Sequence, residues 1–253
     1  MARSLTGNNA RREQVAQSRL LDGLVKRYRP RIRNEIRRAM NAAAAVLGNA
    51  TKLKAVDKEH KRRMSIILTR LWKESGHDMS EHIDPGTKGR KAVSDDVTPT
   101  EVADRVMSEW ILSTGATHVT EITDTTMNNI RKAIADGIEN GLSEKEIAAN
   151  IRAFSPTIAD SRSQTIARTE THEAANVGAQ ATAKATGLKM VREWSASRGG
   201  RTRDTHADAD GQKVGMNAKF KVGRASLRYP GDSSAGHPEE TINCRCAVLF
   251  VLE

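Results

Sequence analysis

Four side chains near the C-terminus are of the types that hold zinc in proteins. His206 lies in the segment RTRDTHADADGQ, His237 in GHPEE, and Cys244 and Cys246 in INCRC. Because residues two apart on a strand point to the same side, both sulfur atoms can face one site. Two thiolates and two imidazoles form a tetrahedral ligand set that suits Zn²⁺. We therefore predict a structural zinc site from these four residues, whose spacing differs from that of a standard zinc finger.

Two other interpretations of this cluster stay open. In the first, the cysteines are small core residues beside the last strand, and the histidines make ordinary loop hydrogen bonds. In the second, His206, His237 and Asn217 serve a metal-dependent nuclease or toxin-like enzyme, in which a general base acts on a metal-bound water. The sequence has no compact ββα signature that would place such groups together. We therefore expect no catalytic residues and no enzyme activity.

Charged residues of the C-terminal half predict an internal ionic network. Glu170 lies in the segment Arg168-Thr169-Glu170-Thr171 and is expected to pair with Arg168 or Arg203, because buried Arg–carboxylate pairs commonly fix how elements dock. The arginines nearer the C-terminus can pair with Asp208 or Asp210, and solvated loop charge is the alternative. The expected network comprises Arg168, Glu170, Arg203, Asp208, Asp210 and Arg245.

Positive charge is concentrated in the first third of the chain. Residues 1–90 hold 21 Lys and Arg against nine Asp and Glu, whereas the remaining residues hold 20 against 22. This asymmetry predicts a polyanion or an acidic protein surface as a neighbour, and a solvated helix face is the alternative. The residues expected to make nucleic-acid or partner contacts are Arg27, Arg29, Arg31, Arg33, Arg37, Arg38, Lys61, Arg62 and Arg63.

Helices must position these basic residues. Apolar residues recur at three- and four-residue spacing over 11–47 and again from about 53 to 75, which predicts a helical hairpin with basic outer faces. Pro30 predicts a kink or a break, and Gly48 and Gly76 predict helix ends. The Gly- and charge-rich residues that follow predict a linker.

The rest of the chain changes from helices to strands. Capping boxes at Thr98–Glu101 and Ser143–Glu146 predict helix starts, and Gly115 predicts a helix end. Helices are expected from 98 to 115, over 121–140, over 144–154 and over 158–186. The small residues of the last segment would let another element approach closely. Strands are expected at Lys189 to Ser195 and Cys246 to Leu252, with long polar loops between them.

Composition sets the fold class. Aromatic residues make up 3% of the chain, so aliphatic side chains must build the core, which favours helix packing. We predict an α+β fold that is mainly α. It consists of a basic helical arm (1–76), a linker (77–97), a helical region that forms a central bundle (98–187), and a small C-terminal α+β domain with long ordered loops (188–253).

Two features bear on location. No apolar run approaches 18 residues and the N-terminus lacks an apolar signal core, so we expect neither a membrane span nor export. The only two cysteines, Cys244 and Cys246, are too close in sequence to cross-link a fold, which fits a reducing intracellular setting.

Short motifs follow one another in a defined order from residue 167 to the C-terminus. They are ARTET at 167–171, Trp194 in a strand, Arg203 with His206, Asp210-Gly211, Phe220, Tyr229-Pro230-Gly231-Asp232 and Asn243-Cys244-Arg245-Cys246. Each is weak alone, but the ordered set is fairly specific. It resembles the phage head morphogenesis family, the Mu F-like or SPP1 gp7-type minor head proteins. The helices upstream fit as well, because this domain usually follows a helical region.

The resemblance implies a low-copy structural component of a tailed-phage head. It implies association with the portal protein during procapsid assembly, with the major capsid or scaffold protein as a further neighbour, and a role in packaging or delivery of DNA. The protein would be made in the host cytoplasm and lie inside the head near the portal vertex. The basic arm would then contact packaged double-stranded DNA and release counterions. A free DNA-compacting protein is a further alternative, but it leaves the ordered C-terminal motifs without a role.

Overall fold

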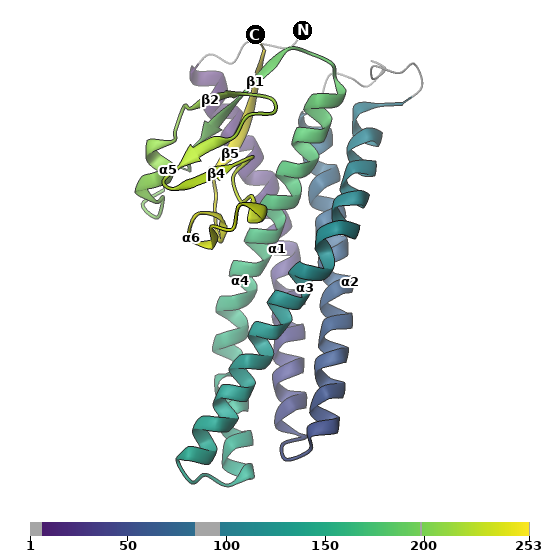
Figure 1. Ribbon diagram of the computed structural model, residues 1–253, viewed down its shortest axis with the longest axis vertical. Coiled ribbons are helices and arrows are strands. Elements are labelled where there is room, and N and C mark those ends of the chain that lie inside the picture. The colour runs from purple at the N-terminus through teal and green to yellow at the C-terminus, as the bar shows by residue number, and fades with distance from the viewer. Residues whose placement is uncertain (1–6, 84–96, 198, 253) are drawn as a thin grey trace. The chain divides into compact units, whose positions relative to one another are not determined.

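A computed structural model describes residues 7–83, 97–197 and 199–252 of the chain. Four long helices, α1 (Gly7–Ala44), α2 (Ala50–Ile83), α3 (Pro99–Glu139) and α4 (Glu144–Ala185), precede a short C-terminal region of strands (Figure 1). That region contains, in order, β1 (Met190–Ser195), α5 (Asp204–Asp208), β2 (Lys213–Gly215), β3 (Phe220–Val222), β4 (Ala225–Leu227), a 3-10 turn η1 (Ser233–Ala235), α6 (Pro238–Thr241) and β5 (Ala247–Leu252). The predicted α+β fold, mainly α, is confirmed.

Local sequence signals set where α3 and α4 begin. Glu101 accepts hydrogen bonds from the backbone and side chain of Thr98, and its own N–H donates to the Thr98 hydroxyl at 3.2 Å. Ser143 and Glu146 make the same reciprocal contacts. Each pair satisfies N–H groups that a helix end leaves without partners, so both predicted capping boxes are present.

The helices extend farther than the sequence predicted. α1 continues through Pro30, α2 continues past Gly76 to Ile83, α3 passes through Gly115, and the two helices expected between 144 and 186 are one helix that contains Pro156. A mid-helix Pro or Gly costs about 1–3 kcal/mol relative to Ala. Packing offsets that cost, because the flanking residues Tyr28 and Ile32 of α1 and Ser155 and Ala159 of α4 are at most 1% exposed.

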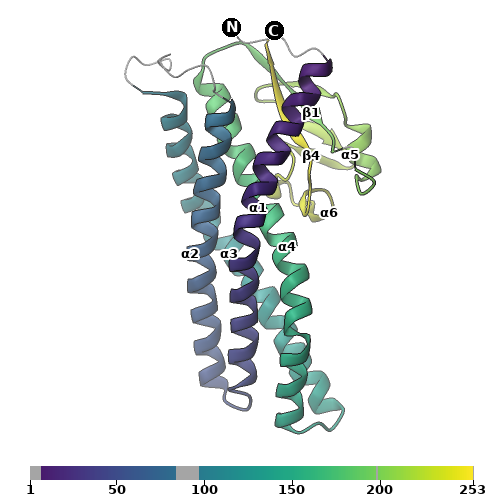
Figure 2. The same ribbon diagram turned by 180° about the vertical axis from the view of Figure 1, so that it is seen from behind.

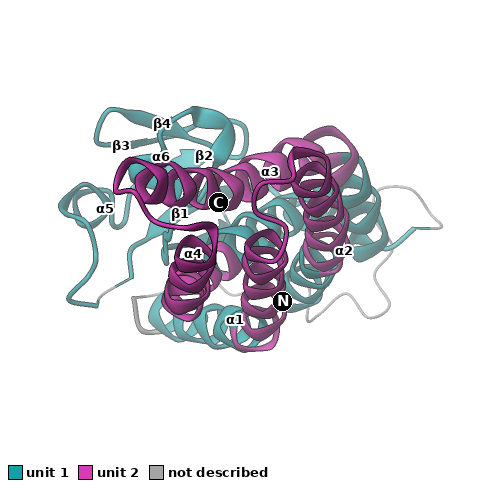
Figure 3. Cartoon of the chain, turned by 90° about the horizontal axis from the view of Figure 1, so that it is seen from below, with its two compact units in different colours: residues 1–25, 71–109, 168–253 teal, residues 26–70, 110–167 magenta. Residues whose placement is uncertain are grey.

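The described chain divides into two compact units (Figure 3). Unit 1 comprises residues 1–25, 71–109 and 168–253, and unit 2 comprises residues 26–70 and 110–167, so each long helix contributes to both. The domain boundaries that the sequence predicted, after residues 76, 97 and 187, are not tested by this division and stay a prediction. Residues 84–96 of the predicted linker lie outside the described residues.

Unit 2 is built from parts of all four long helices. Its buried side chains include Tyr28, Ile32, Ile36, Met40, Met64, Leu68, Met127, Ile130, Ile147 and Ile151. Arg29 of α1 makes two hydrogen bonds to Asp160 of α4, and Lys61 of α2 bridges to Asp124 of α3 at 2.9 Å. These pairs join neighbouring helices around the apolar interior.

Unit 1 packs a small sheet against helices. Its strands run in the order β2-β1-β5, all antiparallel, with Met190 opposite Leu252 and Ser195 opposite Ala247. The two strands expected from the sequence are therefore confirmed. A core cluster joins Leu21 and Leu24 of α1, Met79 of α2, and Ala175 and Ala179 of α4, and Phe250 of β5 packs against it. In Figures 1 and 2 the sheet accordingly lies beside the first part of α1 and the last part of α4.

The small residues of α4 permit close helix packing in unit 1, as the sequence predicted. A Cβ atom built on Gly178 would overlap the backbone of Gly76 in α2. The two helix backbones can therefore touch here only because residue 178 has no Cβ atom. Within the residues that the structure describes, no helix is both long and apolar enough to cross a membrane.

Candidate functional site

Three of the four predicted zinc ligands come together in unit 1. His206 on α5 and Cys244 and Cys246, which precede β5, are each about 2% exposed. His206 Nδ1 lies 3.3 Å from Cys246 Sγ and 3.6 Å from Cys244 Sγ. One possible ligand atom from each of the three residues lies within 4.8 Å of the other two. The spacing Cys-x-Cys at the start of a strand therefore does present both sulfurs to one site.

The fourth predicted ligand, His237, lies outside this group. Its Nδ1 contacts Glu239 Oε1 at 2.9 Å near the start of α6. Instead, Glu240 of α6 approaches the cluster, with Oε2 3.1 Å from His206 Nε2. The same carboxylate oxygen accepts a hydrogen bond from the Thr205 hydroxyl at 2.8 Å. The structure thus assembles two sulfurs and one imidazole, backed by a buried carboxylate.

The two thiols differ in their electrostatics. The pKa of Cys246 is lowered to about 5, chiefly because Cys244 donates a hydrogen bond to its sulfur, with His206 adding to the effect. The pKa of Cys244 is raised, because its proton is held in that hydrogen bond and because the group is buried. One sulfur of the pair is therefore poised to carry negative charge inside unit 1.

Side chains of the strand region hold this cluster in place. The rings of Trp194 and His206 meet edge to face, with centroids 5.5 Å apart, and Phe220 meets Trp194 in a similar way. Asp210 accepts a hydrogen bond from the backbone N–H of Ala196 at 2.8 Å, and Gly211 N–H donates to the carbonyl of Trp194. These contacts fix α5 and the turn after it onto the end of β1, which positions His206.

A buried arginine holds the long loops. Arg192 of β1 is 1% exposed, and its guanidinium donates to the backbone carbonyls of Ala218 and Arg228. It also lies over the Phe220 ring, with 5.2 Å to the centroid. Since Arg offers five donors in a rigid fork, one side chain can satisfy several loop carbonyls at once. Arg192 therefore anchors the long loops between β1 and β5, for which the sequence had indicated no anchoring residue.

The Tyr-Pro-Gly-Asp motif is held against α4. Asn176 donates to the carbonyl of Pro230 at 2.9 Å, and Glu173 accepts from the backbone and hydroxyl of Ser233. Gly231 has a φ of 84°, a left-handed conformation that Gly adopts at little cost. Buried Asp232 accepts from Arg228, which lowers the pKa of that carboxyl although burial opposes the effect. The motif is thus a docked turn.

The first and last motifs of the C-terminal half meet in space. Arg168 Nη1 donates to Asn243 Oδ1 at 2.5 Å, and Asn243 N–H donates to the Thr169 hydroxyl at 2.9 Å. Asn243 has a φ of 61°, in the left-handed region where Asn is among the few tolerated non-Gly residues. α4 therefore shapes the turn that leads into Cys244 and Cys246.

The predicted ionic network takes a different form. Glu170 accepts a hydrogen bond from Trp72 Nε1 at 2.8 Å, and Arg203 donates to the carbonyl of Ile242 at 2.7 Å. Asp210 accepts from a backbone N–H, and Asp208 is exposed. Arg168, Glu170, Arg203 and Asp210 thus make hydrogen bonds to backbone or neutral groups, and the ionic network among the six residues stays a prediction.

A cavity of about 130 Å³ opens beside the cluster. His206 and Cys246 form part of its wall, and among the residues that the structure describes no carboxylate lines it. The other lining residues are Ser197, Gly199, Arg201, Thr202, Arg203, Asn243 and Arg245. Three guanidinium groups around a small cavity favour an anion.

Sequence reasoning missed Trp72, Thr169, Asn243 and Glu240. Asn243 was visible in the motif Asn-Cys-Arg-Cys, and the left-handed preference of Asn before the first cysteine is a signal that could have marked a turn. Glu240 and Trp72 carried no such signal, because their partners lie 34 and 98 residues away in the chain.

The predicted basic surface lies on α1 and α2 in unit 2. Six of the nine predicted contact residues make ion pairs with carboxylates: Arg29 and Arg33 with Asp160, Arg38 with Glu35, Lys61 with Asp57 and Asp124, and Arg62 and Arg63 with Glu59. Arg31 lies over the ring of Tyr28. The side chains are therefore held in defined positions.

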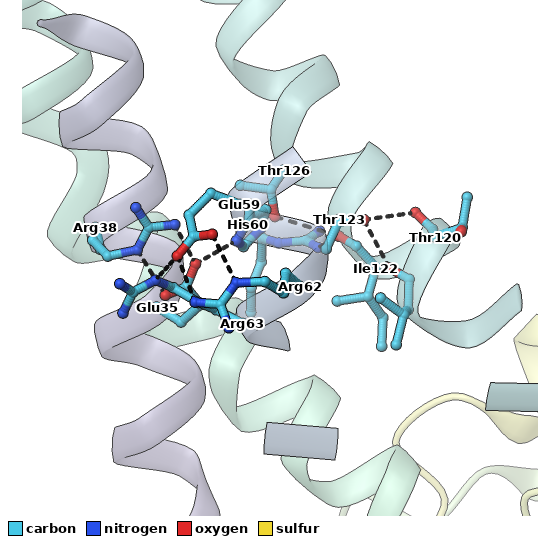
Figure 4. A network of polar contacts seen from close by, with 12 residues as sticks. Glu35, Arg38, Glu59, His60, Arg62, Arg63, Thr120, Ile122, Thr123 and Thr126 are labelled. Carbon is cyan, nitrogen blue, oxygen red and sulfur yellow. Dashed lines mark hydrogen bonds and ion pairs between the residues drawn. The ribbon is translucent and has the colours of Figure 1, made fainter. Parts of the chain in front are cut away.

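Figure 4 shows the centre of this surface, where α1 and α2 face each other. Buried Glu35 accepts two hydrogen bonds from Arg38 and contacts His60 Nδ1 at 2.9 Å. Burial raises the pKa of Glu35, but Arg38 and His60 outweigh it and the net shift is downward. Glu59 is partly exposed, and Arg62 and Arg63 lower its pKa to about 2. Both carboxylates are thus ionised and engaged.

A shallow groove of about 370 Å³ runs along this surface. Its lining residues are Arg31, Asn34, Glu35, Arg38, Arg62, Arg63, Ile66 and Ile67. The only carboxylate among them, Glu35, already serves Arg38 and His60. The groove is therefore a concentration of arginines whose charge is only partly neutralised.

Comparison with known proteins shows a similarity between the C-terminal half and a known family. Residues 128–249 match the sequence profile of the family described as Phage Mu protein F like protein. The minor head protein GP7 of Bacillus phage SPP1 is 33% identical over 135 residues, which are 50% of this chain and 41% of that protein. The residues that match the family profile include the motifs at 168–171 and 243–246.

Two other relatives are more distant. An Enterococcus faecalis protein titled NAD(+)–arginine ADP-ribosyltransferase EFV is 29% identical over 133 residues, which are 51% of this chain and 27% of that protein. A Haemophilus influenzae protein titled as uncharacterized is 29% identical over 127 residues, 50% of this chain and 25% of its own length. No solved structure matches. This chain thus spans less than half the length of each of these relatives, and its residues 128–249 are similar to the phage Mu F-like family.

Proposed function

We propose that this protein is a portal-associated minor head protein that contacts packaged DNA through the basic surface of α1 and α2. The observation that carries the proposal is the charge of residues 26–70, which hold 14 Lys and Arg against three Asp and Glu. All three carboxylates are engaged in ion pairs with basic side chains. The remaining positive charge is uncompensated within this segment and suits a polyanion.

The exposed basic residues of residues 26–70 supply the contacts. They are Lys26, Arg27, Arg31, Arg37, Lys52, Lys54, Lys58, Arg62, Arg63 and Arg70. Lys and Arg that neutralise phosphates release condensed counterions, which gives sequence-independent binding with a steep dependence on salt. Such binding suits a protein that meets a genome of any sequence. The arginine-lined groove of unit 2 is where we expect the backbone phosphates to lie.

A binding experiment tests the DNA contact. The full chain is titrated with a random-sequence DNA duplex between about 50 and 200 mM salt, and fluorescence anisotropy gives the affinity at each concentration. We expect the triple variant Arg31→Gln, Arg37→Gln, Arg62→Gln to bind more weakly and to reduce the salt slope by about 2–3, since each phosphate contact contributes about 0.9 to that slope.

The matched control changes the same number of exposed basic residues in unit 1. It carries Lys219→Gln, Lys221→Gln and Arg224→Gln, all exposed near β3 and β4. This variant should keep the wild-type slope. Equal losses in both triple variants would mean that net charge alone drives binding, and that the surface of α1 and α2 has no special part in it.

The portal contact needs its own experiment. The similarity of residues 128–249 to the Mu F-like family and to a minor head protein supports a role in the phage head, and we propose the portal as the neighbour on that basis. The chain is co-expressed with the portal protein of its own genome, and with the major capsid or scaffold protein in parallel. Co-elution with the portal protein alone supports the assignment. Co-elution with the capsid or scaffold protein alone would move the protein away from the portal vertex.

Structural rather than enzymatic action is part of the proposal. The transferase named in the Enterococcus title belongs to a relative of which this chain matches 27%. We therefore expect no ADP-ribosylated arginine after incubation of the chain with NAD⁺ and arginine-containing protein. Incubation with plasmid DNA and Mg²⁺ or Mn²⁺ tests a nuclease, and cleavage lost on changing His206 would replace the structural assignment with an enzymatic one.

A further inference from the structure

The cluster of His206, Cys244 and Cys246 has the dimensions of a metal site. In a tetrahedral zinc site, with bonds of about 2.0–2.1 Å to nitrogen and about 2.3 Å to sulfur, a nitrogen and a sulfur lie about 3.6 Å apart. The distances from His206 Nδ1 to the two sulfur atoms are 3.3 and 3.6 Å. An ion placed at bonding distance from all three atoms therefore requires only small movements.

The hydrogen bond on the far side of His206 gives independent support. Histidines that bind a metal through one ring nitrogen almost always donate the other N–H to a carboxylate or a carbonyl. Here Nε2 faces Oε2 of Glu240 at 3.1 Å, and Glu240 is 8% exposed. A proton on Nε2 leaves the lone pair of Nδ1 directed at Cys244 and Cys246. The carboxylate thus selects the tautomer that a metal ligand needs.

Positive charge near the sulfurs makes two buried thiolates tolerable. Arg203 and Arg245 line the cavity beside Cys246, and none of the described lining residues is a carboxylate. A divalent cation bound to two thiolates and a neutral imidazole has no net charge, so a buried site of this kind avoids the cost of an isolated ion. Soft sulfur with imidazole nitrogen favours Zn²⁺ over Mg²⁺ or Ca²⁺.

The cavity leaves room for a fourth zinc ligand, which the three side chains do not provide. Zinc in proteins takes four ligands, and sites with three protein ligands keep one position for an exogenous group. Two of the three ligand residues, His206 and Cys246, are also walls of the cavity of about 130 Å³. The other walls include Arg201, Arg203 and Arg245, whose donors suit the oxygens of a phosphate or a carboxylate.

We propose that His206 Nδ1, Cys244 Sγ and Cys246 Sγ bind one Zn²⁺, and that its fourth position opens on the arginine-lined cavity and takes an oxyanion. Both cysteines bind as thiolates, so uptake of zinc releases any thiol proton that the pair still holds. His237, predicted from the sequence as the fourth ligand, takes no part in this site. The assignment does not depend on the proposed contact with DNA.

The first experiment counts the metal and identifies its ligands. The full chain, made without an affinity tag, is stripped with a chelator and titrated with Zn²⁺, and elemental analysis after gel filtration gives the stoichiometry. We expect one Zn²⁺ per chain, with at least a tenfold loss of affinity in Cys246→Ser and in His206→Gln. A stoichiometry near zero in the unaltered protein overturns the proposal.

His237→Gln is the matched control, because it removes an imidazole near α6 that lies outside the group. It should bind Zn²⁺ as the unaltered protein does. A loss of zinc in His237→Gln would show a closed site with two cysteines and two histidines, and would overturn the open position. Replacement of Zn²⁺ by Co²⁺ provides a second readout, since a tetrahedral cobalt site with two thiolates has strong charge-transfer and visible bands.

The second experiment tests the open position. Inorganic phosphate is titrated into the Co²⁺-loaded protein, and the visible spectrum and the ³¹P line width are followed. We expect a saturable spectral change, and at least tenfold weaker binding in the double variant Arg201→Gln, Arg245→Gln. Arg224→Gln, an exposed arginine outside the cavity, is the control and should bind phosphate normally. A spectrum that phosphate leaves unchanged, with acetate equally without effect, rules out the exogenous ligand.

Discussion

Trp72 Nε1 donates a hydrogen bond of 2.8 Å to Oε2 of Glu170, and both side chains are at least 95% buried. Trp72 lies on α2 and Glu170 lies on α4, within the motif at residues 167–171 that marks the family region. An indole N–H can only donate and an ionised carboxylate can only accept, so Trp72 is the donor and Glu170 the acceptor. The glutamate of the motif therefore serves to dock two helices of unit 1.

Removal of that donor tests the docking. Trp72→Phe keeps most of the apolar volume but loses the N–H, and hydrogen bonds to charged groups contribute about 1.5–3 kcal/mol. We expect the free energy of unfolding to fall by about that amount, as measured by urea denaturation. Adding Glu170→Gln to Trp72→Phe should cost less than the sum of the single changes, because the two side chains interact directly. Strict additivity would mean that the hydrogen bond contributes nothing.

Close packing of α2 against α4 predicts opposite effects for two Gly→Ala changes. Gly178→Ala places a Cβ against the backbone of Gly76, which cannot move aside as a flexible side chain can. Overpacking of this kind costs about 1–3 kcal/mol. Gly23 lies inside α1 with nothing near its Cβ position, so Gly23→Ala should stabilise by up to about 1 kcal/mol through helix propensity. Thermal denaturation of the two variants checks the signs, and a stable Gly178→Ala would contradict the close approach.

The ion pair between His82 of α2 and Glu13 of α1 predicts that its contribution to stability depends on pH. His82 Nε2 lies 2.7 Å from Glu13 Oε1, and this hydrogen bond raises the pKa of His82 above its ordinary value of 6.5. The stability that His82 adds is therefore complete below pH 6.5 and is lost as the pH rises through the raised pKa. Burial raises the pKa of Glu13, but bonds from His82 and Gln17 lower it below 4.5, so its contribution is lost as the pH falls through that lowered value.

The pair should thus stabilise most between pH 4.5 and 6.5. We expect His82→Gln to lower the free energy of unfolding by about 0.5–1 kcal/mol in this window and by little at about pH 9, as for a partly exposed ion pair. Urea denaturation at several pH values measures the difference. Glu13→Gln is the companion variant and should show the same pH profile. A difference that does not change with pH would assign the effect to packing.

The turn at Asn243 predicts a difference between two small residues. Asn243→Ala loses the hydrogen bond from Arg168. It also leaves at a φ of 61° a residue that, unlike Asn or Gly, rarely adopts this conformation. Asn243→Gly loses the same hydrogen bond but adopts that φ freely. The Ala variant should therefore be about 1 kcal/mol less stable than the Gly variant, in line with the cost of a left-handed residue. Thermal denaturation ranks them, and equal stabilities would mean that the turn relaxes.

The sequence by itself determined the local elements and the kinds of chemistry. Thr98–Glu101 and Ser143–Glu146 marked the starts of α3 and α4, and short apolar segments near the C-terminus marked β1 and β5, because these signals act over a few residues. The ordered motifs marked the family region, and Cys244 and Cys246 were placed two apart on one side, as the structure has them. The charge of the first third could be counted directly.

Only the tertiary structure decided where helices continue and which side chains meet. Packing around Tyr28 and Ala159 offsets the cost of Pro30 and Pro156, and no window of sequence contains that compensation. The exchange of His237 for Glu240 beside His206 depends on how α6 docks against α5, and the partner of Glu170 comes from α2. Contacts between residues far apart in the chain arise from the sum of many packing terms, whereas caps and periodicity are set by near neighbours.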